Sequence, residues 1–332
     1  MSATLSVVIP VYNEEAGLAA LFERLYAELD KLERQYEIVF VDDGSSDRSV
    51  ALLREQFQRR PDVTRVVVLA RNAGQHMAIL AGFAQTRGDY VVTLDADLQN
   101  PPEEIAKIIV QMDEGADYVG TVRARRHDVY WRKAASRLMN RIRERTTQIS
   151  ITDQGCMLRG YHRSIVEAIN RCLEVSTYVP ALGYTFARHP VEIEVAHAER
   201  KAGQSKYSLY RLIRLNFDLM TGFSVAPLQF FTMAGTALAI LSLLFVLFLA
   251  LRRLVVGPEA EGLFTLFGIA FFLIGVLLVG LGVVGEYVGR IYEQVRQRPR
   301  YTIAAVLEEM SAAAGDATQR MHVTPGQLER HS

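Results

Sequence analysis

Residues 93–104 read TLDADLQNPPEE, and this stretch places two acidic residues where the chain leaves an apolar run. Asp95 and Asp97 stand two residues apart, after β-forming residues and before a double proline. A charge that loses contact with water is costly unless it is paired or hydrogen-bonded. The pattern therefore predicts that both carboxylates meet a cation or hydrogen-bond donors at the end of a buried strand.

Around this stretch, residues 1–125 alternate between apolar runs and amphipathic segments with helical spacing. Strands are expected at 5–12, 36–44, 63–70, 89–97 and 117–122, and helices at 15–33, 46–59, 74–86 and 101–115. Short apolar strands separated by helices predict an α/β fold with a mainly parallel sheet and helices on both faces. In such sheets, ligands bind at the carboxyl ends of the strands.

Three of the expected strands end in residues that suit a nucleotide and a metal ion. These residues are Pro10, Tyr12 and Glu14 after the first strand, Asp42 and Asp43 after the second, and Asp95, Asp97 and Gln99 after the fourth. Each turn alone is also compatible with a solvated turn or a helix N-cap. Carboxylates gathered at one edge repel each other, and Mg²⁺ or Mn²⁺ would relieve the repulsion while holding a diphosphate. Together they favour a nucleotide–metal site.

Other functional classes find little support in the sequence. Neither a G-x-x-x-x-G-K-[ST] loop nor a G-x-G-x-x-G turn follows the first strand. Lys and Arg total 37, as do Asp and Glu, so the chain lacks the basic excess of a nucleic-acid-binding protein. Cys156 and Cys172 form neither a metal-ligand pattern nor a disulfide framework.

The composition changes sharply after Asp218. Residues 219–251 and 263–285 carry no charged side chain, and about 20 such residues span the hydrocarbon core of a bilayer. Membrane spans are expected at about 228–251 and 263–285, forming a transmembrane helical hairpin over 228–289. A pair of buried core helices is the alternative. Gly285 and Gly289 would allow close helix contact, within the hairpin or between subunits of a homo-oligomer.

Basic residues predict how the chain meets the membrane. Arginines flank the expected spans at 211, 214, 290, 296, 298 and 300. The positive-inside rule then places the large N-terminal domain in the cytosol, although Arg252 and Arg253 in the linker weaken the signal. A basic stretch from about residue 129, read as an amphipathic helix, suits the membrane surface. The expected organisation is a catalytic domain over 1–208, an interfacial amphipathic segment over 209–227, the hairpin, and a cytosolic basic segment with a flexible tail over 290–332.

The sequence resembles the family-two glycosyltransferases of the GT-A type, which use nucleotide-sugar donors. The resemblance extends from about residue 6 to residue 302 and is carried by VVIPVYNEE, VDDGSSD, NAGQHMAILAGF, DADLQNPPEEI, GTVR, GCMLRGY, HAERKAGQSKYS and GEYVGRIYEQVRQRPRY. Together with the two spans, these stretches resemble the polyprenyl-phosphate branch of the family. The resemblance implies a multi-pass enzyme of the bacterial inner membrane that acts in lipid A and lipopolysaccharide biosynthesis, a pathway tied to antibiotic resistance.

The resemblance also implies residue roles. Pro10, Tyr12, Glu14 and Asp42 would contact the uridine, with Asp43 beside them, and Asp95, Asp97 and Gln99 would hold Mg²⁺ or Mn²⁺ and the diphosphate. Candidates for phosphate contacts are Arg123, Arg132, Arg200, Ser205 and Lys206. Asp153 is a candidate for an assisting carboxylate.

The implied reaction moves a sugar from a UDP-sugar to undecaprenyl phosphate with inversion at the anomeric carbon. The expected sugar is 4-deoxy-4-formamido-L-arabinose, and UDP-glucose or another nucleotide sugar is an alternative donor. The acceptor phosphate is already ionised near pH 7, so it needs cationic side chains more than a general base. A non-catalytic membrane adaptor is the alternative from another class, and it predicts that Asp97→Ala leaves function intact.

Overall fold

A computed structural model describes residues 4–123, 151–153, 155–172, 178–196, 225–256, 263–296 and 298–309. The chain divides into two compact units. The first combines Met1–Val129, Ile149–Ser205 and Arg298–Ser332, and the second combines Tyr130–Gln148 and Lys206–Gln297. The first unit therefore holds the expected strands and their carboxylates, and the second holds both apolar segments.

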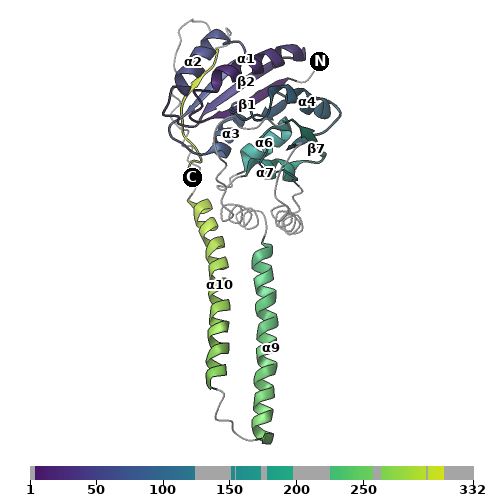
Figure 1. The fold of residues 1–332 in the computed structure, drawn as a ribbon, viewed down its shortest axis with the longest axis vertical. Coiled ribbons are helices and arrows are strands. Elements are labelled where there is room, and N and C mark those ends of the chain that lie inside the picture. Colours follow the sequence, from purple (N-terminus) through teal and green to yellow (C-terminus); the bar gives the residue numbers. More distant parts are fainter. Residues whose placement is uncertain are drawn as a thin grey trace, which may run out of the picture. The chain divides into compact units, whose positions relative to one another are not determined.

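The first unit is built on an eight-stranded sheet in the described part of the chain (Figure 1). Its strands are β1 (Leu5–Val11), β2 (Tyr36–Asp42), β3 (Thr64–Leu69), β4 (Tyr90–Thr93), β5 (Tyr118–Arg123), β6 (Arg159–His162), β7 (Pro190–Val195) and β8 (Ile303–Leu307). The strand order is β7-β5-β6-β4-β1-β2-β3-β8. β1 pairs in parallel with β2 and β4, β2 with β3, and β5 with β7, whereas β6 and β8 pair antiparallel with their neighbours.

Helices connect these strands and cover both faces of the sheet. They are α1 (Leu18–Leu29), α2 (Ser49–Arg59), α3 (Gln75–Phe83), α4 (Ile105–Asp113), α6 (Arg163–Arg171) and α7 (Val179–Phe186), with short 3₁₀ turns at Asp30–Leu32 and Pro102–Glu104. The five strands and four helices expected within residues 1–125 are all present, with ends shifted by a few residues. The prediction of a mainly parallel α/β sheet is confirmed.

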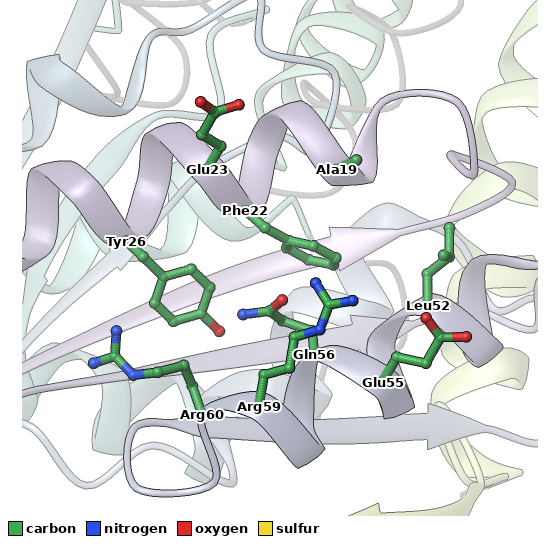
Figure 2. Close-up of a pocket in the computed structure, with 9 residues that line it drawn as sticks. All are labelled: Ala19, Phe22, Glu23, Tyr26, Leu52, Glu55, Gln56, Arg59 and Arg60. Carbon is green, nitrogen blue, oxygen red and sulfur yellow. The ribbon is translucent and has the colours of Figure 1, made fainter.

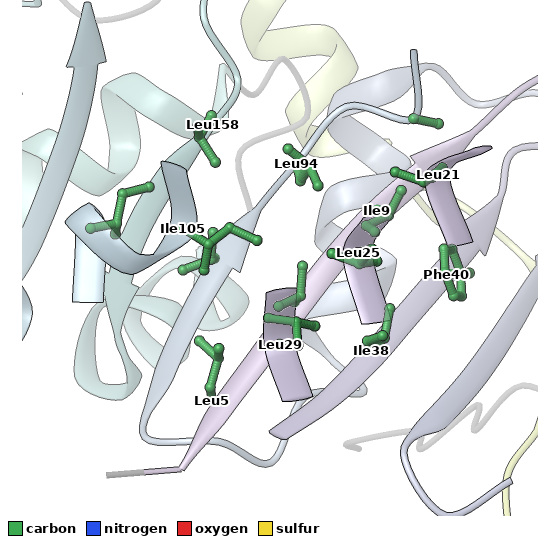
Figure 3. Packing of buried hydrophobic residues seen from close by; sticks show 14 of the residues in the cluster. Leu5, Ile9, Leu21, Leu25, Leu29, Ile38, Phe40, Leu94, Ile105 and Leu158 are labelled. Atoms are coloured by element: carbon green, nitrogen blue, oxygen red, sulfur yellow. The ribbon is translucent and has the colours of Figure 1, made fainter. Parts of the chain in front are cut away.

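Alternating side chains of β1 explain why the sheet is covered on both sides. Val7 and Ile9 point to one face, where they join a buried cluster with Leu21 and Leu25 of α1 (Figure 3). Val8 points to the other face and packs so closely under α3 that a side chain at Gly82 would overlap it. A strand buried on both faces lacks a polar side, so it appears in the sequence as a continuous apolar run.

The strand β8 was not expected from the sequence. It covers the edge of β3, and the backbone N–H of Ala70 donates to the carbonyl of Thr302 at 2.8 Å. Just beyond the strand, Glu308 forms ion pairs with Arg65 at 3.3 Å and Arg87 at 2.7 Å. An open sheet edge exposes unpaired backbone groups, so β8 protects β3 from pairing with other chains.

The second unit contains two long helices, α9 (Ala226–Val256) and α10 (Leu263–Val295). Among the described residues, one stretch is long and apolar enough to cross a membrane, Ile269–Val295, with a mean hydropathy of 2.4. A shorter apolar stretch, Leu228–Leu238, lies in α9. Both expected spans are thus helical, and the crossing of a membrane by either helix stays a prediction.

Of three glycines on α10, Gly280 packs against α9, whereas Gly285 and Gly289 do not. A side chain at Gly280 would overlap the ring of Phe231, so this glycine allows α9 and α10 to pack closely. A side chain added at Gly285 or Gly289 would meet no atom of the described residues within 4 Å. The expected Gly285–Gly289 contact is therefore not made within the described hairpin, and a contact between subunits stays a prediction.

Gly160 offers a test of the packing of β6. A side chain at this position would overlap Ile108 and lie 2.9 Å from the Met112 sulfur, because α4 crosses β6 there. We expect Gly160→Ala to lower the free energy of unfolding by about 1–3 kcal/mol through overpacking. Gly17→Ala is the matched control, because its nearest neighbours would lie 3.9 Å away. Urea denaturation of both variants measures the difference, and equal stabilities would contradict this packing.

Candidate active site

The loops that follow β1 and β2 are joined by a series of hydrogen bonds. The backbone N–H of Asn13 donates to Ser45 Oγ at 3.0 Å, and the N–H of Ser46 donates to Asn13 Oδ1 at 2.9 Å. The N–H of Glu14 donates to Ser49 Oγ at 3.0 Å. Parallel pairing of β1 with β2 brings these strand ends together, and the hydrogen bonds then fix both loops as one wall of the site.

Asp42 lies at the end of β2 and is fully buried. Its Oδ2 accepts hydrogen bonds from the backbone N–H groups of Gly44 and Ser45, both at 3.1 Å. Its Oδ1 is also buried and has no hydrogen-bond partner among the described residues. A buried acceptor without a donor costs free energy, so Asp42 Oδ1 has an unmet hydrogen-bonding capacity, and a contact of Asp42 with a ligand stays a prediction.

Asp43 faces the loop that follows β3 instead. Its two carboxylate oxygens accept the backbone N–H groups of Ala73 at 2.7 Å and Gly74 at 2.9 Å. Burial raises the pKa of the Asp43 carboxyl, and these two hydrogen bonds oppose the rise. Both oxygens are therefore occupied by the protein, and a direct contact of Asp43 with a nucleotide stays a prediction.

Asp95 and Asp97 lie in the turn after β4, and both are partly buried. Asp97 Oδ1 accepts the backbone N–H of Gln99 at 3.1 Å, and Asp95 Oδ1 accepts the side-chain amide of Gln75 at 2.6 Å. Burial, and then the charge of Asp97, raise the pKa of Asp95 to about 7. The Asp97 carboxylate thus lies close enough to Asp95 to oppose its ionisation.

Arg123 reaches the same edge of the sheet from the end of β5. Its guanidinium binds Asp153 through two hydrogen bonds, Nε to Oδ2 at 2.6 Å and Nη2 to Oδ1 at 2.8 Å. Its charge also lowers the pKa of Asp95, although burial and Asp97 outweigh this effect. The structure therefore brings two candidates together as a forked ion pair beside the acidic turn, a geometry that fixes the guanidinium plane.

Arg159, which the sequence analysis did not identify, supports this ion pair. Its side chain is fully buried at the start of β6 and donates to the carbonyls of Asp153 at 2.6 Å and Cys156 at 2.9 Å. It also donates to the hydroxyl of Tyr118 at 2.6 Å. Two of these hydrogen bonds hold backbone carbonyls at Asp153 and Cys156, and the third anchors the guanidinium to Tyr118. A single arginine in the sequence gives no sign of such a role.

Of the remaining candidate site residues, three lie at or near the end of β1 and four lie outside the described residues. Tyr12 is 49% exposed and Glu14 is partly buried, so both are accessible beside the joined loops, and Pro10 lies within β1. The predicted residues Arg132, Arg200, Ser205 and Lys206 lie outside the described residues.

The acidic turn provides two carboxylates for a metal ion. Among the described residues, no group of three or more His, Cys, Asp or Glu side chains could hold a metal. Mg²⁺ is usually bound by one or two carboxylates together with substrate phosphates, so two are sufficient. Asp95 and Asp97 fit such an ion, because a cation would offset both the burial and the repulsion from Asp97 that raise the pKa of Asp95.

A surface pocket lies elsewhere in the first unit, between α1 and α2 (Figure 2). It is lined by Ala19, Phe22, Glu23, Tyr26, Leu52, Glu55, Gln56, Arg59 and Arg60. None of the predicted site residues is among them. Arg60 is already paired with Asp30 at 3.4 Å and lies over the ring of Tyr26, so the charges of this pocket are partly satisfied within the protein.

The raised pKa of Asp95 predicts how the metal-free protein responds to pH. Between about pH 4 and pH 7 the folded state holds a proton that the unfolded state releases, so stability falls as pH rises. A displaced pKa is worth at most about 1.4 kcal/mol per pH unit. We expect Asp95→Asn to be more stable than the wild type at pH 8 in EDTA, with little difference near pH 4. Thermal unfolding measures this, and a variant less stable than the wild type at pH 8 would contradict it.

Comparison with known proteins identifies the family. Residues 6–169 match the model for glycosyl transferase family 2. The chain is 51% identical over 305 residues to undecaprenyl-phosphate 4-deoxy-4-formamido-L-arabinose transferase of Edwardsiella ictaluri, covering 91% of this chain and 94% of that protein. The protein of the same name from Pseudomonas aeruginosa UCBPP-PA14 is 50% identical over 327 residues, covering 98% and 96% of the two chains.

Similar solved structures include glucosyl-3-phosphoglycerate synthase of Mycobacterium tuberculosis, determined with Mn²⁺, UDP-glucose and phosphoglyceric acid. It shares 17% sequence identity with a TM-score of 0.46, and the match covers 67% of this chain and 78% of that one. The family resemblance expected from the sequence is confirmed by the much closer relatives. With a mainly parallel α/β sheet of the GT-A type and half of its residues shared with those relatives, the chain belongs to glycosyl transferase family 2 and is a glycosyltransferase.

Proposed function

We propose that the protein transfers 4-deoxy-4-formamido-L-arabinose from a UDP-sugar to undecaprenyl phosphate in bacterial lipid A modification. The observation that carries the proposal is the gathering of Asp95, Asp97 and Arg123 at one edge of the sheet, in a chain about 50% identical to relatives of that name. Acidic and basic groups side by side suit a reaction that handles a metal–diphosphate leaving group and an anionic acceptor.

The uridine would bind where the loops after β1 and β2 are joined. Asp42 Oδ1 is a buried acceptor without a partner among the described residues, and an N–H group of the base would satisfy it. Tyr12 is 49% exposed beside it and offers a ring surface against which a base can pack. Pro10 and Glu14 complete the proposed uridine site.

Asp95 and Asp97 would hold Mg²⁺ or Mn²⁺, with Gln99 beside them. When bound, the ion would neutralise negative charge on the diphosphate of the leaving UDP. The protein contributes the placement of both carboxylates, which the backbone N–H of Gln99 and the amide of Gln75 hold at 3.1 and 2.6 Å.

The acceptor chemistry explains why the ion pair of Arg123 and Asp153 suits this site. The phosphate of the lipid carries about −1.5 to −2 charges near pH 7, so its oxygen needs no general base. Asp153 is 2% exposed and bound at both oxygens by Arg123, which suits a carboxylate that orients the guanidinium. Arg123, with Arg132, Arg200, Ser205 and Lys206, would then guide the acceptor anion, and a single direct displacement would invert the anomeric carbon.

The membrane location is part of the same proposal. The lipid acceptor keeps its tail in the bilayer, so the site must work at the interface. α9 and α10 would cross the bacterial inner membrane as a hairpin, supported by the apolar stretch Ile269–Val295 in α10. The arginines that flank the two helices favour a cytosolic catalytic unit.

A donor panel tests the proposed substrate. Purified full-length protein in detergent, with undecaprenyl phosphate and Mn²⁺, is offered UDP-4-deoxy-4-formamido-L-arabinose, UDP-glucose and UDP-N-acetylglucosamine in separate reactions. Mass spectrometry of the lipid fraction should find a sugar-phosphate lipid with the arabinose donor and at least about 100-fold less with the others, because a site that hydrogen-bonds a substrate group can reject analogues lacking it by about 10⁴–10⁵-fold. Preferred transfer of glucose would contradict the sugar assignment but not the reaction class.

Asp97→Ala tests the role of the acidic turn. We expect transfer to fall by about two to three orders of magnitude, the usual scale for losing one preorganised electrostatic contact. Asp113→Ala is the matched control, because Asp113 is a half-exposed carboxylate at the end of α4 that pairs with Arg34 at 2.8 Å. Retention of full turnover by Asp97→Ala, with metal chelated, would exclude the metal-dependent reaction.

A further inference from the structure

The amide side chain of Gln75 bridges two loops of the site. Gln75 is the first residue of α3, and its Nε2 donates to Asp95 Oδ1 at 2.6 Å. We propose that Gln75 is a positioning residue that fixes the orientation of the Asp95 carboxylate, so that its second oxygen is presented to a divalent cation. The inference rests on the proposed metal-dependent function and adds to it the first residue of α3.

The position of Gln75 is itself determined by buried contacts. Asp43, 3% exposed, accepts the backbone N–H groups of Ala73 and Gly74 with its two oxygens. Gly74 has a φ of +96°, a conformation that side chains rarely adopt, and the chain turns there into α3. The hydrogen bonds from Ala73 and Gly74 to Asp43 thus fix the backbone just before Gln75. This places the Gln75 side chain next to the acidic turn.

A neutral donor is well suited to this role. The Gln75 amide donates to one oxygen of Asp95 at 2.6 Å and leaves the negative charge of the carboxylate available to a metal ion. A lysine here would support the same charge but would compete with the cation for the carboxylate. The amide supplies a donor without adding charge, in the way that second-layer partners orient metal-binding carboxylates.

Gln111 provides a matched control for Gln75. Its side-chain amide also donates to a carboxylate, Glu114 Oε2, at 2.8 Å. That pair is exposed at the end of α4 and includes none of the proposed site residues. Gln75→Met and Gln111→Met each remove one amide–carboxylate hydrogen bond while keeping a side chain of similar length.

The test is Mn²⁺ binding to the full-length protein in detergent with UDP at a fixed concentration, followed by the electron paramagnetic resonance signal of free Mn²⁺. We expect Gln75→Met to weaken Mn²⁺ binding by about tenfold, the lower end of the effect of losing a second-layer partner, and Gln111→Met to bind as the wild type does. Saturating Mn²⁺ should restore most of the turnover of Gln75→Met, a recovery that general damage to the fold would not show.

Two results would overturn the inference. Gln75→Met that binds Mn²⁺ as tightly as the wild type would exclude an effect of Gln75 on the metal. A loss of turnover that Mn²⁺ does not restore would place the role of Gln75 elsewhere. Asp95→Asn separates these results from failure of the proposed function: if the wild type with UDP binds no more Mn²⁺ than Asp95→Asn, the metal site itself is wrong.

Discussion

The site depends on two carboxylates, Asp95 and Asp97, held two residues apart in a partly buried turn. Their mutual repulsion and their burial raise the pKa of Asp95 to about 7, so the turn is a place where positive charge is favoured. Two neighbouring groups favour the negative charge of this turn. Arg123 reaches the edge from β5, and the Gln75 amide donates from α3. Arg123 reaches this edge because β5 and β4 both pair antiparallel with β6, which lies between them, and therefore run in the same direction.

The fold could be predicted where burial leaves a clear pattern. β1 to β5 appear as apolar runs because helices cover both faces of each strand, and their ends shifted by only a few residues. β6 consists of Arg159–His162, in which a buried arginine and a glycine replace apolar residues, so nothing in its composition marks a strand. β8 is a five-residue apolar segment that follows the second apolar helix, and only its pairing with β3 reveals it.

The site could be predicted where a motif follows a strand. The turns after β1, β2 and β4 carry recognisable acidic patterns, and parallel pairing necessarily brings them together. Spacing could not show that Asp43 binds the backbone of another loop or that Asp153 binds Arg123, because both depend on contacts between distant residues. Gln75 had one available signal: it follows the carboxyl end of β3, a third parallel strand at the same edge, although a single glutamine matches no motif.

The position of the metal is the most direct test of the central claim that the acidic turn binds the cation of a metal–diphosphate. A structure determined by X-ray diffraction at the manganese absorption edge, from protein crystallised with MnCl₂ and UDP, would locate the ion by its anomalous signal. The account predicts a manganese peak at coordination distance, about 2.1 Å, from a carboxylate oxygen of Asp95 or Asp97. A manganese peak on the diphosphate with neither carboxylate within reach would contradict it.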